Sequence, residues 1–347
     1  PAYNSPDTLK AMQFVTIKGI IADANNVKVE DFNGKINPTV FDKQSNIITF
    51  GSDGNSIMSF SLWRNIIYKG RAEVKNGEFS FSFIVPRDIA YNYGPGKISY
   101  YATNGTTDAS GNYSDLTIGG FSDEEIQDFE GPDVTLFIND SSFREGGFTD
   151  ENPVLLAYIS DSSGVNTIGN SIGHDIVAIL DDDTRNPFIL NDYYVADINT
   201  HKSGSIRFPM YNLPAGPHAL RLRLWDVNNN SVEVSTSFVV APDDQLVLND
   251  LEAWPVPMRD NVTFAIGHNQ AGKELSLTLS VYNLTGSLVT TYQKKLLAGG
   301  FRTPVFQWDG RGLNGRPLTP GFYLANLRVE TPEGYTSDKS VKIIIAR

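Results

Sequence analysis

The chain has 347 residues, of which 40% are hydrophobic and 20% charged, and its formal net charge is −12. This length exceeds what one ordinary hydrophobic core requires, so two or three domains are expected, and the composition is that of a globular rather than a disordered protein. The acidic balance argues against a nucleic-acid groove, and no apolar run reaches the ~20 residues that a membrane-spanning helix needs.

The sequence contains no cysteine, which excludes a thiol nucleophile, a disulfide framework and a thiolate metal site within these residues. Charge is unevenly distributed along the chain. Residues 243–347 contain 11 Lys and Arg against 10 Asp and Glu, a net charge of +1, whereas residues 1–242 contain 17 against 30, a net charge of −13. The difference indicates either separate roles for the two parts or chance variation in composition.

Residues 1–130 show short β-branched and alternating runs and almost no helical periodicity. The clearest signal is the pair Asn76-Gly77, which suits the positive φ angles of a type I′ turn and predicts a β-hairpin. In the second strand of this hairpin, aromatic residues alternate with serines and are expected to share one face: Phe79, Phe81 and Phe83. One helical turn is expected, at Ser122–Gln127, where Ser122 can act as the cap.

A second block begins at Gly131-Pro132, because Gly-Pro before a strand breaks regular structure. Up to Pro242 it contains about seven short runs separated by turn residues, which is the pattern of a β-sandwich. Its cleanest alternation places three residues on an inward face: Leu220, Leu222 and Leu224.

The third block, residues 243–347, again consists of alternating runs, and its final run reaches almost to the end of the chain. The turn at Asn283–Gly286 joins two of its strands. Together the three blocks predict an all-β protein of three consecutive immunoglobulin-like β-sandwich domains, at residues 1–130, 131–242 and 243–347.

The sequence carries no catalytic motif. The four histidines have no partner at zinc-ligand spacing: His174, His201, His218 and His268. His218 leads into a strand and is interpreted as a surface or edge residue. No nucleophile elbow, phosphate-binding loop or dinucleotide fingerprint occurs. The sequence therefore predicts no catalytic, cofactor-binding or metal-binding residue.

Two acidic segments are candidate oxygen-ligand sites for a cation. In the glycine-rich segment from 161 to 175, Asp161 and Asp175 either approach a cation or belong to a long hairpin whose glycines satisfy turn geometry, and the hairpin is favoured. Asp181–Asp183 lacks the glycine and the distal glutamate of an EF-hand loop. This segment is expected to be a hairpin tip with solvated charges.

The third block carries an ordered series of motifs. They are Trp254-Pro255-Val256-Pro257-Met258, Leu279–Gly286, Trp308-Asp309-Gly310-Arg311, Pro320-Gly321-Phe322-Tyr323 and Lys342–Ile345. This order resembles the sorting domains of type IX secretion and the similar immunoglobulin-like domain of flagellar hook-capping proteins. Trp254 and Met258 depart from the usual Tyr and Phe of the opening motif.

Turn chemistry gives these motifs structural roles. Trp308 is expected to fill the sandwich while Asp309-Gly310 turns the chain. Gly321 is expected to let the next strand begin without a side-chain clash. The sorting-motif and structural positions are Trp254, Pro257, Gly286, Trp308, Asp309, Gly310, Gly321, Tyr323 and Lys342.

Upstream segments extend the resemblance to essentially the whole chain. The segments that carry it are Phe32–Gly34, Pro38–Lys43, Ile67–Gly70, Gly77–Pro86, Glu151–Pro153, Gly169–Asp175 and Trp225–Asn229. They resemble the region that follows the peptidase domain in the PorU family, the gingipain-like sortases of the type IX secretion system in Bacteroidetes.

This resemblance implies a non-catalytic C-terminal region that is extracellular and associated with the outer membrane. It also implies two partners, the upstream peptidase domain of the same protein and an outer-membrane β-barrel of the PorV type. The catalytic Cys and His of the family lie in that upstream domain, so no enzyme activity and no cofactor are expected of this chain.

Two other classes of function stay open. A carbohydrate-binding or adhesin module would present exposed aromatic residues on a strand face, and packing in the core or at an edge explains the candidates more simply. These candidates are Tyr91, Tyr93, Tyr100 and Tyr101. An enzyme in its own right would have to show peptidase activity without a cysteine.

Overall fold

The computed structural model of the protein describes residues 2–3, 7–54, 56–123, 128–168, 173–242 and 245–346. In these residues the chain forms 29 β-strands and two 3₁₀ turns, and no α-helix. The predicted all-β class is confirmed. The helical turn expected at Ser122–Gln127 falls mainly on residues 124–127, which lie outside the described residues, and the described part contains no helix able to span a bilayer.

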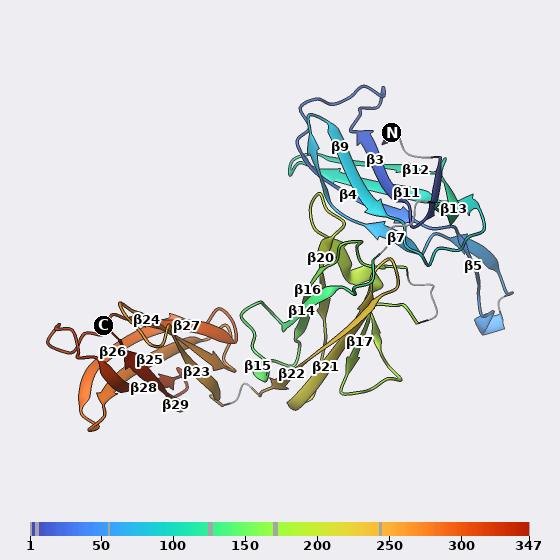
Figure 1. The fold of residues 1–347 in the computed structure, drawn as a ribbon. Helices are drawn as coiled ribbons and strands as arrows, with labels where there is room; N and C mark the ends of the chain where they lie inside the picture. Colours follow the sequence, from blue (N-terminus) through green and yellow to red (C-terminus); the bar gives the residue numbers. More distant parts are fainter. Residues whose placement is uncertain are drawn as a thin grey trace. The chain divides into compact units, whose positions relative to one another are not determined.

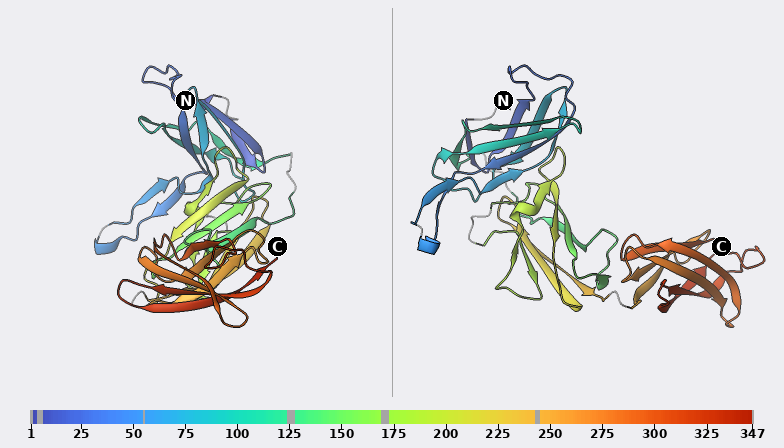
Figure 2. Two further views of the ribbon diagram at one scale, coloured as in Figure 1. Left: turned by 90° about the vertical axis from the view of Figure 1, so that its left-hand side faces the viewer. Right: turned by 180° about the vertical axis from the view of Figure 1, so that it is seen from behind.

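The contacts of the fold divide the chain into two compact units. One comprises Pro1–Leu136, Leu155–Phe208 and Leu220–Ser235, and the other comprises Phe137–Val154, Pro209–Ala219 and Thr236–Arg347. Each sheet draws its strands from one of three consecutive stretches, 2–121, 133–240 and 248–345 (Figures 1 and 2). Neither division tests the domain boundaries near residues 130 and 242, which stay predictions.

The first stretch forms a large sheet, a small sheet and a separate hairpin. The large sheet has the order β1-β3-β9-β8-β4-β11-β12, with β7 also paired to β4; the small sheet has the order β10-β13-β2, and β5 pairs only with β6. The bounds are β1 (Ala2–Tyr3), β2 (Thr8–Ala11), β3 (Phe14–Ile20), β4 (Gly34–Phe41), β5 (Ser45–Ile48), η1 (Ser52–Gly54), β6 (Ser59–Leu62), β7 (Ile66–Lys69), β8 (Ala72–Lys75), β9 (Glu78–Ile84), β10 (Gly94–Pro95), β11 (Lys97–Thr103), β12 (Asp108–Tyr113) and β13 (Thr117–Phe121).

A row of aromatic rings forms the core of the large sheet. Asn76 and Gly77 join β8 to β9 with φ angles of 51° and 73°, so the predicted hairpin is confirmed. The three alternating phenylalanines are buried on one face, as expected from strand periodicity: Phe79, Phe81 and Phe83. The ring of Tyr68 stacks on the last two of them with centroid distances of 5.7 and 4.7 Å.

The second stretch forms two sheets, with the orders β14-β16-β20-β19 and β15-β22-β21-β17-β18. The bounds are β14 (Asp133–Ile138), β15 (Gly147–Thr149), β16 (Val154–Ser160), β17 (Val177–Leu180), β18 (Phe188–Ile189), η2 (Asn191–Tyr193), β19 (Tyr194–Ala196), β20 (Ser203–Pro209), β21 (Gly216–Trp225) and β22 (Ser231–Val240). The three predicted core leucines of β21 are each 0% exposed: Leu220, Leu222 and Leu224.

The tip between β17 and β18 contains Asp181–Asp183. All three residues are exposed, and the two strands pair antiparallel on either side of them. The Asp183 carboxylate accepts a hydrogen bond from the Arg185 backbone N–H at 3.1 Å, as in an Asx turn. The predicted hairpin tip is confirmed, although its charges are not all simply solvated: the Asp182 carboxylate lies 3.1 Å from the Arg221 guanidinium.

The third stretch forms a sandwich of two sheets, β23-β24-β27 and β26-β25-β28-β29 (Figure 1, orange to red). The bounds are β23 (Leu248–Trp254), β24 (Val262–His268), β25 (Glu274–Asn283), β26 (Leu288–Leu297), β27 (Arg302–Trp308), β28 (Gly321–Glu330) and β29 (Thr336–Ile345). Both sheets contribute apolar side chains to one buried cluster, in which Trp308 is the largest residue. We call this stretch the terminal sandwich.

Candidate functional site

The core of the terminal sandwich contains two of the motif residues. Trp308 is 1% exposed, and its indole N–H donates to the Arg311 carbonyl at 3.0 Å. The Tyr323 hydroxyl donates to the Thr319 carbonyl at 2.8 Å, and its ring meets Trp308 edge-on at a centroid distance of 6.4 Å. Because both polar groups are satisfied, the two large rings can be buried without cost from unpaired donors.

The motif residues that follow Trp308 form a tight turn. The Asp309 carboxylate accepts the Arg311 backbone N–H at 3.1 Å, and Gly310 has a φ of 70°. Gly286 closes the turn between β25 and β26 with a φ of 79°. Both glycines occupy the left-handed region that L side chains adopt at a cost, so these positions serve chain reversal.

Gly321 is required for a different reason from the one predicted. A Cβ atom built at this position would meet no heavy atom within 4 Å, so no clash is avoided. Its φ is 156°, a conformation that L side chains rarely adopt. The backbone conformation, and not the space around it, therefore favours glycine at the start of β28.

Five of the nine motif positions are exposed: Trp254, Pro257, Gly286, Asp309 and Lys342. Trp254 is 45% exposed and Pro257 is exposed, whereas the neighbouring Met258 is fully buried and pairs its backbone with the end of β29. The ammonium group of Lys342 lies 4.1 Å from the centroid of the Phe322 ring. Among the exposed positions, Gly286 and Asp309 form turns, whereas Trp254, Pro257 and Lys342 are available for contacts.

The outer face of the four-stranded sheet has an apolar end. The register places Leu324 of β28 between Tyr282 of β25 and Lys342 of β29. Phe322 lies opposite Ile344 and Leu288 opposite Tyr282 on the same face. Phe322, Leu324 and Leu288 are 44, 48 and 45% exposed. We call Tyr282, Leu288, Phe322, Leu324, Lys342 and Ile344 the docking patch.

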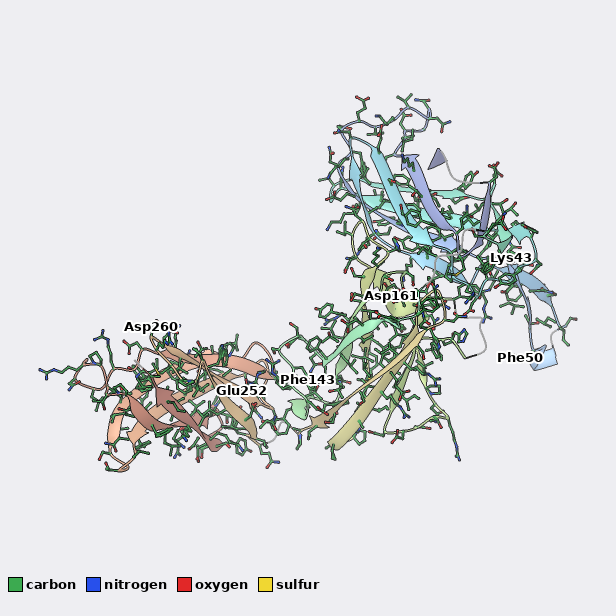
Figure 3. The ribbon with its side chains drawn as sticks, in the orientation of Figure 1. Lys43, Phe50, Phe143, Asp161, Glu252 and Asp260 are labelled. Carbon is green, nitrogen blue, oxygen red and sulfur yellow. The ribbon has the colours of Figure 1, made fainter. Side chains whose placement is uncertain are left out.

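A second exposed apolar feature is the hairpin of β5 and β6, residues 45–62, which we call the arm. Phe50 near its tip is 98% exposed, and Figure 3 shows it at the far end of the hairpin. Five further large apolar residues of the arm are exposed: Ile48, Ile57, Met58, Phe60 and Leu62. Asp53 is the single charged residue in the arm. Clusters of this kind mark interaction sites in soluble proteins.

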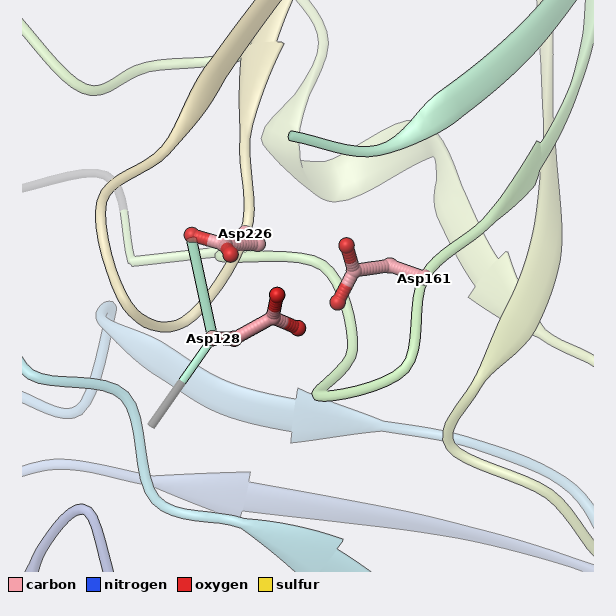
Figure 4. Close-up of side chains that lie close together, drawn as sticks. All are labelled: Asp128, Asp161 and Asp226. Atoms are coloured by element: carbon pink, nitrogen blue, oxygen red, sulfur yellow. The ribbon is translucent and has the colours of Figure 1, made fainter. Parts of the chain in front are cut away.

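Three carboxylates converge from three loops in the unit that begins at Pro1. Atoms of Asp128, Asp161 and Asp226 lie within 4.8 Å of one another (Figure 4). Burial of Asp226 raises its pKa to about 6, and burial also raises the pKa of Asp161. A hydrogen bond from the Ser162 hydroxyl lowers the pKa of Asp128.

Each of these carboxylates also locks a turn. Asp161 accepts the backbone N–H groups of Ser163 and Gly164 at 2.8 and 2.7 Å, and Asp226 accepts those of Asn228 and Asn230 at 2.9 and 2.7 Å. Oxygen ligands suit calcium, which takes about six to eight of them, so this set alone is incomplete. Asp175, the other residue predicted to approach a cation, is not part of the group, and residues 169–172 of its loop lie outside the described residues.

The histidines have structural surroundings. His218 is 6% exposed, its Nε2 lies 2.8 Å from the Pro214 carbonyl, and its ring stacks on Phe238. The prediction of a surface or edge residue was therefore wrong, because the strand position looked exposed while the ring is covered by Phe238. His268 is fully buried, and burial lowers its pKa to about 4.

His174 lies in a polar network in the same unit as the three carboxylates. Its Nδ1 is 2.7 Å from the Asp88 carboxylate, which also accepts the side-chain amides of Asn166 and Asn229 at 2.8 and 2.7 Å. Among the described residues, these contacts form a hydrogen-bond network around the Asp88 carboxylate.

The tyrosines proposed for carbohydrate binding do not form one aromatic surface. Tyr91 and Tyr93 are exposed, but Tyr91 packs edge-on against Phe121. Tyr100 and Tyr101 are consecutive in β11 and point to opposite faces, and Tyr100 packs against Phe79. Burial raises the pKa of the Tyr100 hydroxyl above its usual range.

Comparison with known proteins finds similarity among solved structures. No protein-family model and no curated protein sequence matches the chain. Among solved structures, the dimeric latent PorU of Porphyromonas gingivalis is 32% identical over 98% of this chain, with a TM-score of 0.39, and the match covers 32% of that protein. The identity over nearly the whole length supports a PorU-related region, and the chain spans about a third of its relative's length.

Other solved structures are more distant. An activated α-2-macroglobulin of Escherichia coli is 12% identical, with a TM-score of 0.22; the match covers all of this chain and 34% of that protein. A tetra-tandem repeat of a large adhesion protein is 11% identical, with a TM-score of 0.23; the match covers all of this chain and 73% of that one. Likeness at this level supports no inference about function.

Proposed function

We propose that this chain is the C-terminal, non-catalytic region of a PorU-like sortase of the type IX secretion system. In this role it serves as a cell-surface scaffold, and its terminal sandwich anchors the protein to an outer-membrane β-barrel of the PorV type. The observation that carries the proposal is the 32% identity over 98% of the chain, combined with the sorting-type motif order in residues 254–345.

The site chemistry supports a non-catalytic role. The chain has no cysteine, and the described histidine–carboxylate pair is held by asparagine amides. The exposed features with unusual composition are apolar, as expected of surfaces that bind other proteins. Any peptidase activity of the purified chain would contradict this part of the proposal.

The anchoring role can be tested by direct binding. The full chain would be immobilised, and a type IX outer-membrane β-barrel in lipid nanodiscs would be passed over it. We expect saturable binding with a dissociation constant of about 1 μM or tighter. Empty nanodiscs and an unrelated outer-membrane barrel serve as controls. Binding no stronger than these controls, with the chain folded, would overturn the anchoring proposal.

A second candidate function is self-association through the arm. The relative from P. gingivalis is described as dimeric. In this chain β5 and β6 form a two-stranded sheet, so each strand has an edge that no other described strand covers. An exposed, apolar and nearly uncharged edge favours pairing with a second copy.

This candidate is tested by sedimentation velocity over a range of concentrations. Replacement of two arm residues, Phe50→Ser and Ile57→Ser together, should shift the chain toward monomer by at least tenfold in dissociation constant. Val27→Ser, at an exposed apolar residue outside the arm, is the matched control and should leave the distribution unchanged. A monomeric wild-type chain at high concentration would exclude self-association.

A further inference from the structure

The docking patch is apolar, whereas most of the outer face of the same sheet is polar. Away from the patch, most facing pairs on the outer surface are polar, such as Thr278 with Gln293, Asn326 with Ser340, and Arg328 with Asp338. Leu297, which faces Glu274 and is 68% exposed, is a single apolar exception. An antiparallel sheet with one solvated face normally keeps this polar pattern along its whole length. At the patch end, leucine and phenylalanine take the outward positions instead.

The apolar side chains of the patch are neighbours and not scattered. Leu324 faces Tyr282 across one strand pair and Lys342 across the other. Phe322 is two residues from Leu324 on the same face of β28, and Ile344 is opposite it. Single exposed leucines are common on protein surfaces, but a contiguous group on one sheet face indicates an interaction site.

Lys342 indicates which chemical group the expected partner carries. Its ammonium group rests over the Phe322 ring, and no carboxylate in the described part of the chain forms a salt bridge with it. A cation among apolar residues is paired most effectively by a carboxylate that arrives with an apolar surface. Because residues 243–347 have a net charge of +1, this domain does not repel an approaching acidic surface.

A lipid surface fits the patch less well than a protein. Binding to anionic lipid typically uses about four to eight clustered Lys and Arg residues, whereas the patch contains Lys342 alone. Polar side chains beside the patch hydrogen-bond across strands, as Asn326 does to Ser340 at 3.0 Å, and so give the patch a polar border. A shaped protein surface can cover such a flat apolar area with a polar rim around it.

We propose that the docking patch is the surface by which the terminal sandwich binds its membrane-protein partner, at a site of that partner where apolar side chains surround a carboxylate. The inference rests on the anchoring role proposed above and assigns it to one face of one sheet. Leu324 and Phe322 form the apolar centre of the contact, and Lys342 pairs with the partner's carboxylate.

The test uses the full chain and the nanodisc-embedded type IX β-barrel. Leu324→Asn and Lys342→Glu should each weaken binding at least tenfold. Two matched controls alter exposed residues of the same sheet outside the patch: Gln293→Glu on the outer face of β26, and Lys339→Glu, a charge reversal on β29. Both controls should change the affinity less than twofold, and all four variants should unfold within about 2 °C of wild type.

The outcomes separate the two proposals. If the wild type binds the barrel and the patch variants bind equally well, the patch is not the docking surface, while the anchoring role stands. If the wild type does not bind the barrel, the anchoring role falls and the patch assignment falls with it. If Lys342→Glu weakens binding to empty nanodiscs as strongly as to the barrel, the partner is lipid and the proposed protein partner is wrong.

Discussion

The two faces of strand β28 differ in burial and, in our proposal, in purpose. Inward residues such as Tyr323 and Leu327 are 8 and 0% exposed and pack in the core, whereas outward residues such as Phe322 and Leu324 are nearly half exposed. The motif series identified Tyr323, which holds the fold. A sorting-type motif therefore identifies the sandwich, while in our proposal the neighbouring positions of the same strand form the surface that selects a partner.

The sharpest test of the inward side is Trp308→Ala. Removing this fully buried ring leaves a cavity in the terminal sandwich and the Arg311 carbonyl without its donor, so we expect a loss of about 3–5 kcal/mol in the free energy of unfolding. Urea denaturation followed by circular dichroism would measure it. A loss below about 1 kcal/mol would mean that the ring does not pack as the structure places it.

Asp226 is a buried carboxyl group whose ionised form destabilises the folded state at neutral pH, in contrast to the stabilising buried ring of Trp308. Burial beside Asp161 and Asp128 raises its pKa from 3.8 to about 6, so the folded state binds the proton more tightly than the unfolded state. The contribution of this group is therefore most favourable below pH ~4 and declines as pH rises toward ~6. Asp226→Asn removes this cost, so it should raise the free energy of unfolding at pH 7, relative to its effect at pH 4, by up to about 3 kcal/mol. At both pH values it loses the hydrogen bond that the Asn230 side-chain amide donates to the second Asp226 oxygen at 2.8 Å.

The control for this prediction is Asp226→Ala, which also removes the acceptor for the Asn228 and Asn230 backbone N–H groups. It should destabilise the chain at pH 4 more than Asp226→Asn, which keeps one oxygen acceptor for these backbone groups. Both measurements require a chelator in the buffer, so that no cation neutralises the carboxylates. An equal effect of Asp226→Asn at pH 4 and pH 7 would contradict the raised pKa.

A smaller cost is expected where the backbone itself limits substitution. Gly77 has a φ of 73°, and a Cβ atom there would lie 2.3 Å from the Val29 carbonyl oxygen. Gly77→Ala should therefore destabilise the chain by about 1–2 kcal/mol. Gly105→Ala is the matched control, because its φ is also positive at 89° but its Cβ would meet nothing within 4 Å. Thermal unfolding of the two variants separates the clash from the conformational strain.

Local patterns in the sequence predicted the fold well. The alternation around Phe81 and the Asn76-Gly77 pair specify a strand and its turn from neighbouring residues alone, and the structure has both. The three-carboxylate group could not be predicted in this way, because Asp128, Asp161 and Asp226 come from separate loops that only the tertiary fold brings together. Asp161 and Asp226 each show a local Asx-turn pattern, but neither pattern indicates that the two residues lie close together in the fold.

Exposure was the harder property to predict. His218 looked like an edge residue, and only the packing of Phe238 on its ring shows that it is buried. The exposure of the arm could not be predicted from the sequence for the opposite reason. Its apolar residues have the same composition as a core strand, and what distinguishes Phe50 is its exposure of 98%, because no other described element covers it. Composition indicates what a segment can bury, but not whether the chain itself provides the cover.

The smallest expected change in stability belongs to the outward side of β28. Phe322→Ser removes an exposed ring and its contact with Lys342, which together should alter the free energy of unfolding by less than about 1 kcal/mol. The same substitution one position further along the strand, Tyr323→Ser, should cost about 3 kcal/mol or more, because that ring packs on Trp308. If the docking patch is correct, Phe322→Ser nevertheless weakens barrel binding, and binding titrations beside urea denaturation would show stability and affinity changing independently. Equal losses of stability at the two positions would show that both faces of β28 serve the core alone.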